Sequence, residues 1–250
     1  MNTREAIACV ILARAGSRGV PGKNVAPVAG RPCIAWTIDH ALASTLTTVT
    51  LVSTDDPVAA STARASGVAV VDRPASLASD SARVDDAVRQ CILAHEVAAG
   101  PVGAVVILYG NVPVRPAGLI DRAIQRLLDG DCDSVQSYAP VGKHHPWWTA
   151  RLVGDGMEAC AWEPGAPLNH GVFRRQDLPP AYIPDGGVLV ASRRALFLEI
   201  PGVEPGPHAF LGARRAGVVN PEGSVVDIDA PIDLLVADAI LARRVSPVAA

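Results

Sequence analysis

Short apolar runs alternate with segments of helical periodicity, and this alternation restricts the possible folds more than any other feature of the chain. The run Ala6–Leu12 is apolar throughout, the pattern of a strand buried on both faces. Further strands are expected at Thr50–Ser53, Val68–Val71, Val105–Leu108 and Ser134–Ser137. Helices are expected between them, at 32–44, 57–66, 84–99 and 119–128. The alternation predicts a three-layer α/β/α fold with a mainly parallel, Rossmann-like sheet and right-handed crossovers.

The regular alternation of strands and helices ends after Ala139. From about residue 140 to 187 the chain is rich in Pro, Gly, His and Trp, with weak strands only around 151–153 and 159–162. We interpret this stretch as an excursion from one domain that spans residues 1–250. Later strands are expected at Val188–Ala191, Val218–Val219 and Val225–Ile228, followed by a helix from Pro231.

Composition excludes several classes of function. The chain has 22 Lys and Arg against 25 Asp and Glu, so it lacks the basic excess that binds nucleic acid. No apolar run approaches the ~20 residues of a membrane helix, and the N-terminus lacks a signal-peptide pattern. The five cysteines include no close pair, which argues against a disulfide framework or a zinc ribbon. These features predict a cytoplasmic protein.

A loop of three glycines and three cations follows the first strand. It reads RAGSRGVPGKN, from Arg14 to Asn24. Glycines allow backbone N–H groups to approach an anion, and cations neutralise its charge. The spacing fits neither GxxxxGK[ST] nor GxGxxG. The loop predicts a polyphosphate site, and the alternative is a plain connection from strand to helix.

Two carboxylates lie near the other end of the chain. Strand alternation would place Asp227 and Asp229 on one face, with Ile228 on the other. Two adjacent carboxylates repel each other unless a cation lies between them, and Mg²⁺ bound by one or two carboxylates plus phosphates is usual at nucleotide sites. The alternative is that Asp229 caps the helix that begins near Pro231.

Four stretches together resemble the acylneuraminate cytidylyltransferase family. ILARAGSRGVPGKN is similar to the family's A-R-x-x-S-K-G-x-P-x-K-N motif, and LVSTDD with RPASLASD is similar to V-S-T-D followed by R-P-x-x-L-A-x-D. VVILYGNVPVR occupies the place of L-L-Q-P-T-S-P-L-R, and VVDIDAPIDLL is similar to the closing D-I-D-x-x-x-D-L segment. The resemblance covers residues 6 to about 242 and implies a nucleotidyltransferase sheet.

The resemblance implies that the anomeric hydroxyl of a sugar attacks the α-phosphate of CTP, giving a CMP-sugar and pyrophosphate. It implies catalytic roles for Arg14, Lys23 and Asp229, and Mg²⁺ held by Asp227 and Asp229. The nucleotide-binding residues it implies are Ala13, Arg14, Gly16, Ser17, Arg18, Lys23, Asn24, Arg73, Asp80 and Ser81. From the residues alone, Arg73-Pro74 could equally be a turn, and Asp80 or Ser81 a helix cap.

Two stretches depart from the family pattern. The Q-P-T-S-P-L-R stretch is YGNVPVR here, so Tyr109, Asn111 and Arg115 stand where substrate contacts are implied. R-P-N-G becomes IPDG, so Asp185 adds negative charge where many relatives accept a sugar carboxylate. We therefore expect a nonulosonic acid-like sugar other than N-acetylneuraminate. The alternatives are a related sugar nucleotidyltransferase, Kdo-type or using another nucleotide, and a nucleotide-binding scaffold without turnover.

The excursion contains KHHPWW at 143–148 and an arginine pair, Arg174-Arg175. The resemblance implies that this segment crosses a homodimer and helps to close the partner's sugar site. The adjacent histidines lack Cys or acidic neighbours and make a poor metal-ligand set. Arg174 is a candidate clamp for a carboxylate or phosphate, and simple solvation is the alternative.

Overall fold

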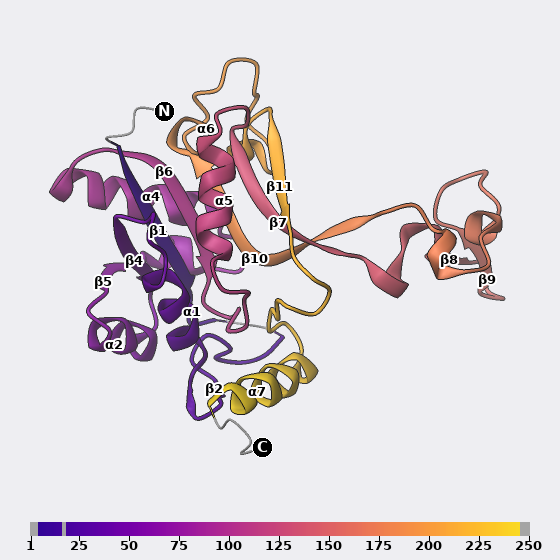
Figure 1. Cartoon of the computed structure of the whole chain (residues 1–250), viewed down its shortest axis with the longest axis horizontal. Coiled ribbons are helices and arrows are strands. Elements are labelled where there is room, and N and C mark those ends of the chain that lie inside the picture. Colours follow the sequence, from indigo (N-terminus) through magenta and orange to yellow (C-terminus); the bar gives the residue numbers. More distant parts are fainter. Residues whose placement is uncertain (1–4, 17–18, 246–250) are drawn as a thin grey trace.

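A seven-stranded sheet forms the centre of the computed structural model, which describes residues 5–16 and 19–245 (Figure 1). Its strands are β1 (Ala6–Ala13), β4 (Val49–Thr54), β5 (Ala69–Asp72), β6 (Val102–Tyr109), β7 (Ser134–Pro140), β10 (Tyr182–Ser192) and β11 (Arg215–Val219). They are ordered β11-β7-β10-β6-β1-β4-β5. Only β10 runs antiparallel to its neighbours β6 and β7, and the other pairs are parallel. The mainly parallel sheet predicted from the alternation is confirmed.

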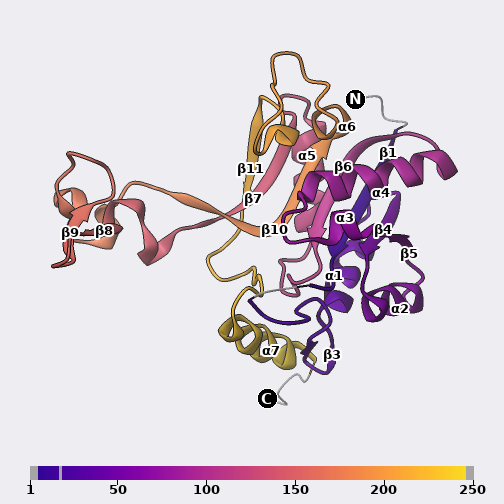
Figure 2. The same cartoon turned by 180° about the vertical axis from the view of Figure 1, so that it is seen from behind.

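Helices cover both faces of this sheet. The helices are α1 (Cys33–Leu42), α2 (Pro57–Ala65), α3 (Ala75–Ala78), α4 (Val84–Ala99), α5 (Leu119–Leu128), α6 (Arg193–Leu196) and α7 (Pro231–Val245). Buried residues of α1, α2 and α5 form one core cluster with the sheet, and those of α4 and α6 form another. Figure 1 shows α5 in front of the sheet, and Figure 2, from behind, shows α4 in front. The predicted three layers are therefore present, and no described helix has the length and apolarity to cross a bilayer.

Alternation along β1 explains why its sequence is apolar without interruption. Cys9 and Ile11 belong to the cluster on the α1 face, whereas Val10 and Leu12 belong to the cluster on the α4 face. β1 lies between β6 and β4, near the middle of the sheet. A central strand that is covered on both faces has no side exposed to water, so every position along it favours an apolar residue. The prediction of a strand buried on both faces is therefore confirmed for β1.

The turn chemistry around α2 agrees with the sequence. The Asp56 carboxylate accepts hydrogen bonds from the N–H groups of Val58 and Ala59, at 2.8 and 3.1 Å. Pro57 takes the first helical position, and Gly67, with φ of +72°, follows the end of the helix. These features fix the entry to α2, next to the carboxyl end of β4, and its exit toward β5.

The prediction of a strand at Val225–Ile228 is wrong. This segment is extended, but its only bridge within the described residues is an antiparallel one from Val226 to Val114. The Ile228 N–H donates to the Asn111 carbonyl at 3.0 Å. The segment therefore pairs with the irregular loop after β6 instead of joining the sheet, which the local apolar pattern does not reveal.

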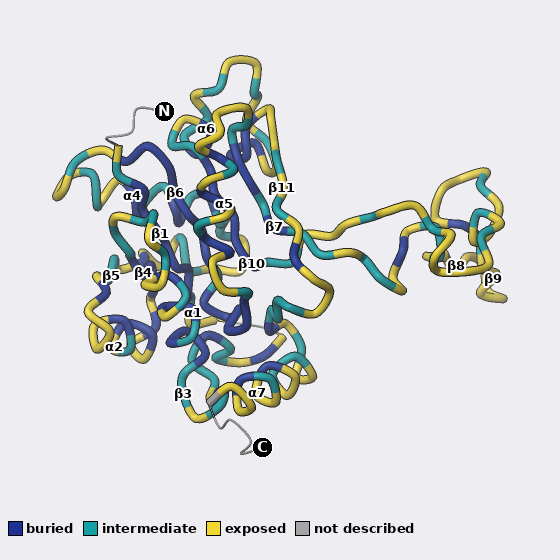
Figure 3. Tube along the Cα trace, viewed as in Figure 1, coloured by how far each residue is buried: buried dark blue, intermediate teal, exposed yellow. Residues whose placement is uncertain are grey.

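The excursion is an arm between β7 and β10 that projects from the body (Figures 1 and 2). It carries the hairpin of β8 (Ala150–Val153) and β9 (Glu158–Ala161), where the weak strands were expected. Most of the arm is exposed or half-buried (Figure 3). Within the arm, the Trp147 ring stacks on His170 at 4.7 Å between centroids. A short pair, β2 (Pro27–Val28) and β3 (Arg31–Pro32), lies beside α7.

Ile124 tests the layered core. Its side chain is fully buried on α5 against the sheet. Ile124→Ala should lower the free energy of unfolding by about 2–5 kcal/mol, because it removes buried surface and leaves a cavity. Denaturant titration measures this. Gln125→Ala, on the exposed side of the same helix, is the control and should change stability by less than about 0.5 kcal/mol. Equal effects of the two substitutions would contradict the packing described.

Candidate active site

The glycine loop leaves the carboxyl end of β1 and closes against the segment that precedes α7. The Asn24 side-chain amide donates to the Arg14 carbonyl at 2.9 Å, which joins the two ends of the loop. A Cβ on Gly19 would lie 2.3 Å from the Asp229 carbonyl oxygen, so only glycine allows this approach. The loop and the aspartate segment are therefore in direct contact although they are 206 residues apart at Lys23 and Asp229. Ser17 and Arg18 lie outside the described residues.

Lys23 and the two aspartates come together at this contact. Lys23 Nζ lies 2.6 Å from Asp229 Oδ1. Asn111 Nδ2 donates to Asp227 Oδ1 and to the Ile228 carbonyl, the second at 3.1 Å. Ile228 itself is fully buried in a third core cluster with residues of α7. Burial of this one side chain fixes the segment, and the carboxylates on either side of it meet groups from the glycine loop and the loop after β6.

Asp233, and not Asp229, caps α7. Asp233 Oδ2 accepts hydrogen bonds from the N–H groups of Asp229 and Ala230, at 3.0 and 2.7 Å. The Asp229 carboxylate is therefore free of capping and is available to Lys23 and to a ligand. The geometry favours the metal interpretation of Asp229 over the cap interpretation.

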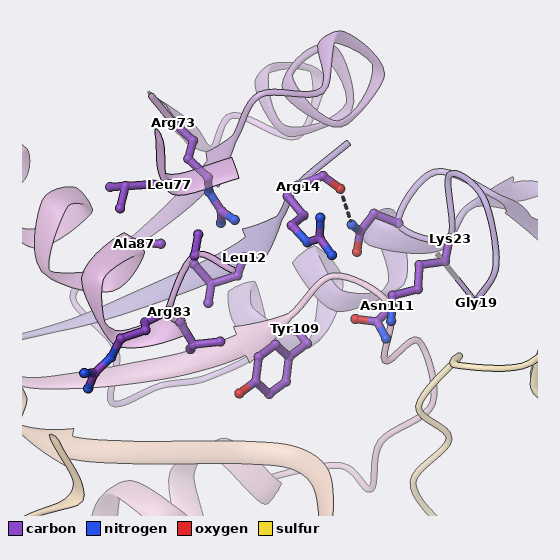
Figure 4. Close-up of a pocket in the computed structure, with 13 residues that line it drawn as sticks. Leu12, Arg14, Gly19, Lys23, Arg73, Leu77, Arg83, Ala87, Tyr109 and Asn111 are labelled. Carbon is purple, nitrogen blue, oxygen red and sulfur yellow. Dashed lines mark hydrogen bonds between the residues drawn. The ribbon is translucent and has the colours of Figure 1, made fainter. Parts of the chain in front are cut away.

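A cavity of about 200 Å³ lies between the glycine loop, the start of α4 and the end of β6 (Figure 4). Six of its lining residues were predicted at the site, namely Arg14, Lys23, Asn24, Arg73, Tyr109 and Asn111. The lining also includes Gly19 of the predicted glycine loop and six residues that were not named as site residues, namely Leu12, Leu77, Ala82, Arg83, Val84 and Ala87. The stretch RPASLASD, which resembles a family motif, ends shortly before α4, and this continuity was the signal that could have found Arg83 and Ala87.

The arginines of this cavity are held by the protein. Arg14 Nη2 lies 2.8 Å from Asp80 Oδ1. Arg73 is buried and donates to the Ser53 hydroxyl and carbonyl, at 3.2 and 2.9 Å. Burial lowers the pKa of Arg73, and the Asp55 carboxylate opposes this effect. Together with Lys23, these guanidinium groups make one wall of the cavity cationic, as an anionic ligand requires.

Asn24 contributes an unpaired acceptor to the same cavity. It is 5% exposed, and its Oδ1 atom has no hydrogen-bond partner among the described residues. A buried acceptor without a partner costs about 1–3 kcal/mol, so this atom is suited to receive a donor from a ligand.

The carboxylate pair has the electrostatics of a cation site. The pKa of Asp227 is raised to about 6, mainly by burial and next by the nearby negative charge of Asp229, while Lys23 and Arg115 act to lower it. A bound divalent cation would relieve both effects. Two carboxylates form an incomplete set, and among the described residues no three His, Cys, Asp or Glu side chains gather into a metal cage. Oxygen donors from few carboxylates, completed by phosphates and water, fit Mg²⁺.

A second, larger cavity of about 510 Å³ adjoins the first. The two cavities share Arg83, Val84 and Tyr109 as lining residues. The remaining residues of the second cavity are Asp85, Gln136, Pro184, Leu189, Pro207, His208, Phe210, Leu211 and Arg215. Adjoining cavities with a common wall could hold two reactants side by side.

Three residues expected to contact substrate lie elsewhere. Arg115 is 1% exposed, and its guanidinium binds the carbonyls of Tyr109, Val112 and Gly187, so it holds the loop after β6 in place. Burial lowers the pKa of Arg115 to about 10. The carboxylate of Asp185 accepts hydrogen bonds from the side chains of Ser137 and Asn220 and from the Gly187 N–H. Arg174 is on the arm and pairs with Asp177. The structure brings none of the three to the cavities.

Comparison with known proteins identifies the family. A family model described as cytidylyltransferase matches residues 8–155, more than half of the chain. The chain belongs to the cytidylyltransferase family. The family relationship predicted from the sequence motifs is therefore confirmed. The match includes the glycine loop, Arg73, Asp80 and the loop after β6, so it covers most of the first cavity.

Individual relatives are consistent with this membership. N-acylneuraminate cytidylyltransferase of Streptococcus agalactiae serotype III (strain NEM316) is 30% identical over 194 residues, which cover 76% of this chain and 44% of that protein. N-acylneuraminate cytidylyltransferase A of Danio rerio is 30% identical over 93% of this chain and 50% of that protein. The chain thus spans about half the length of these curated relatives. A solved structure, CMP:2-keto-3-deoxy-manno-octonic acid synthetase complexed with CTP, has a TM-score of 0.66 at 17% identity, with 96% of this chain and 99% of that chain covered, and shares the fold.

Two substitutions in the aspartate segment test which aspartate stabilises the start of α7. Asp233→Ala should lower the free energy of unfolding by about 1 kcal/mol, because two N–H groups at the start of α7 lose their acceptor. Asp229→Asn should change stability by less than about 0.5 kcal/mol, because its side chain makes no cap. Thermal unfolding of both variants measures this, and a larger loss for Asp229→Asn would restore the cap interpretation.

Proposed function

We propose that this protein transfers CMP from CTP to the anomeric hydroxyl of a nonulosonic acid-like sugar and releases pyrophosphate. One observation carries the proposal: the cationic glycine loop meets the pair Asp227 and Asp229 beside a cavity, with Lys23 Nζ 2.6 Å from Asp229 Oδ1. The names of the relatives, two of which are N-acylneuraminate cytidylyltransferases, support the choice of CTP and of the sugar class. We place the reaction in the cytoplasm, where the five free cysteines stay reduced.

The first cavity is proposed to hold CTP. Arg14, Lys23 and Arg73 would bind the triphosphate, and the Asn24 acceptor would receive a donor from the nucleotide. The neighbouring loop residues Ala13, Gly16, Ser17, Arg18, Asp80 and Ser81 would complete the nucleotide site. Asp227 and Asp229 would hold Mg²⁺, which when bound neutralises charge on the phosphate oxygens. The cations keep the triphosphate extended along the loop, so that its α-phosphorus faces the second cavity.

The second cavity is proposed to hold the acceptor sugar. Tyr109 stands between the two cavities, and its ring is available to stack on a sugar or a base. The anomeric oxygen forms the new bond to the α-phosphorus as the bond from this phosphorus to the bridging oxygen breaks. Pyrophosphate leaves with that oxygen, and the proton of the anomeric hydroxyl is released to water. Asn111, held to Asp227 and Ile228, fixes the loop that carries Tyr109.

We further propose that the arm mediates a homodimer. It exposes large apolar side chains, among them Leu152, Met157, Trp162 and Phe173, the last 94% exposed. Apolar side chains grouped on a projecting segment are typical of an interaction surface. Across a two-fold axis, each arm would reach the partner and cover its acceptor site.

A pyrophosphate-release assay tests the function. The protein is incubated with Mg²⁺, each nucleoside triphosphate in turn, and a panel of sugar acids that includes N-acetylneuraminate and 2-keto-3-deoxy-manno-octonic acid. Release that requires both CTP and one sugar acid supports the proposal. Turnover with another nucleotide would replace CTP, and efficient turnover of N-acetylneuraminate alone would defeat the expected change of acceptor. A nucleotide-dependent thermal shift without release from any acceptor would indicate a scaffold.

Lys23 should be needed for triphosphate binding. Lys23→Ala should raise the KM for CTP and lower kcat/KM by about 10- to 100-fold, because a charge-assisted contact is lost. Steady-state kinetics measure this. Arg126→Ala on α5, where Arg126 pairs with Asp131 away from both cavities, is the matched loss of one cation. If the two variants have equal kinetics, Lys23 has no part in binding.

The dimer depends on the apolar surface of the arm. Phe173→Asp combined with Trp162→Asp should convert a dimer of the full chain into a monomer. The substitutions remove two apolar rings from the interface and place two charges there. Light scattering coupled to size-exclusion chromatography gives the mass. Val97→Asp changes a side chain that is 92% exposed on α4 of the body, and it should leave the dimer intact. A monomeric unaltered chain at high micromolar concentration would contradict the assembly.

A further inference from the structure

The lining of the second cavity combines apolar and charged side chains. The apolar ones include Pro184, Leu189, Phe210 and Leu211, and the charged ones are Arg83, Asp85 and Arg215. Asp85 does not cancel the arginines, because its buried carboxylate is shared between Arg83 and Arg89, at 2.8 and 2.9 Å. The cavity therefore has an excess of positive charge beside apolar surface.

Arg83 is fixed by Asp85 at the start of α4. Its Nε and Nη2 atoms donate to the two carboxylate oxygens, at 3.1 and 2.8 Å, and Nη2 also contacts the Gly206 carbonyl at 3.3 Å. Nη1 has no hydrogen-bond partner within residues 5–16 and 19–245. Figure 4 shows the guanidinium directed away from Arg14 and Tyr109, and its contact with Gly206 places it beside the loop that borders the second cavity. A two-point attachment to a buried carboxylate orients this cation before any ligand binds.

Arg215 is held in a similar way at the start of β11. Its Nε donates to the Gly212 carbonyl at 3.3 Å, and its Nη2 donates to the His208 carbonyl at 3.1 Å. Again Nη1 has no partner in the part of the chain that the structure describes. Two arginines thus line one cavity, each anchored through two nitrogens with a third left over.

The arm arginines, by contrast, are already paired within the chain. Arg174 donates twice to Asp177, at 2.8 and 3.2 Å, and Arg175 pairs with Glu222 at 2.9 Å. Neither lines either cavity. Within one chain, the arginines that line the second cavity are therefore Arg83 and Arg215 of the body.

We propose that Arg215 and Arg83 determine acceptor specificity by binding the carboxylate of the sugar acid. The inference rests on the proposed function and assigns the recognition to these two residues of the body. An anion placed among apolar residues is stabilised only if cations or hydrogen-bond donors replace its water. The Nη1 groups of Arg83 and Arg215 would donate to the carboxylate, and a neutral acceptor would leave the excess positive charge of the cavity without a counter-charge.

Arg215→Ala is the central test, with kcat/KM measured for a sugar acid and for its uncharged carboxamide. The unaltered protein should prefer the acid. The variant should lose about 10- to 100-fold in kcat/KM for the acid, as expected for loss of a charged hydrogen bond, and change by less than about 3-fold for the carboxamide. The KM for CTP should stay within about 2-fold, because Arg215 is absent from the first cavity.

Three further variants complete the design. Arg214→Ala removes the neighbouring cation, which lines neither cavity, and should keep the kinetics of the unaltered protein. Arg215→Lys should keep part of the preference for the acid that Arg215→Ala loses, because lysine retains the positive charge but lacks the planar guanidinium group. Arg83→Gln should weaken the acid preference as Arg215→Ala does.

The outcomes separate this inference from the proposed function. Equal losses for acid and carboxamide, or no loss for either, would overturn the assignment of Arg215 while leaving the transferase activity established. If the unaltered protein releases no pyrophosphate with any acid, the proposed function fails. Calorimetric titration of the sugar acid into the unaltered and Arg215→Ala proteins then still decides the binding role, and equal affinities would refute it.

Discussion

The contact between the glycine loop and the segment before α7 is the constraint on which the site depends. Its visible part is the ion pair of Lys23 and Asp229, but Asp229 is largely exposed, and exposed ion pairs contribute little to stability. What fixes the contact is the third core cluster, where Val20 of the loop packs with Ile228 and with Ala237 and Leu241 of α7. Apolar packing thus brings together charged groups from the two ends of the chain, and the ion pair follows from it.

The loop after β6 contacts the same aspartate segment, and Arg115 holds this loop in place. Arg115 binds three backbone carbonyls of this loop and its surroundings and also donates to Thr37 of α1. The loop so held presents Asn111 to Asp227 and Tyr109 to both cavities. A buried guanidinium is costly unless its donors are satisfied, and here backbone carbonyls and the Thr37 hydroxyl satisfy them. Buried Arg115 therefore helps to position the proposed metal ligand Asp227, because it holds the loop from which Asn111 donates to Asp227.

Local patterns predicted those parts of the fold that local physics determines. The uninterrupted apolar run of β1, the Asp56-Pro57 start of α2 and the glycine loop each carry their cause within a few residues. The antiparallel direction of β10, the pairing of Val226 with Val114 and the burial of Arg115 depend on partners far away in the chain. The local hydrophobic periodicity of the sequence does not encode such long-range partners, so it could not predict these features.

The site shows the same division. Arg14, Lys23 and the two aspartates were predicted because their residue types carry the chemistry of phosphate and metal binding. Arg83 and Arg215 were not, because an arginine at a helix start or on an edge strand is ordinarily a solvated residue. Only the cavity that they share distinguishes them from other surface arginines.

The arm's attachment has a consequence for how such a protein can diversify. β7 and β10, which lead into and out of the arm, are adjacent antiparallel strands paired along both the sheet and the arm's base, from Ser134–Ala191 to Pro140–Tyr182. The arm is thus a long hairpin whose root is fixed by the sheet. Insertions, deletions or exchanges at its tip leave the strand order untouched, so the arm can change in length and surface without disturbing the sheet or the glycine loop.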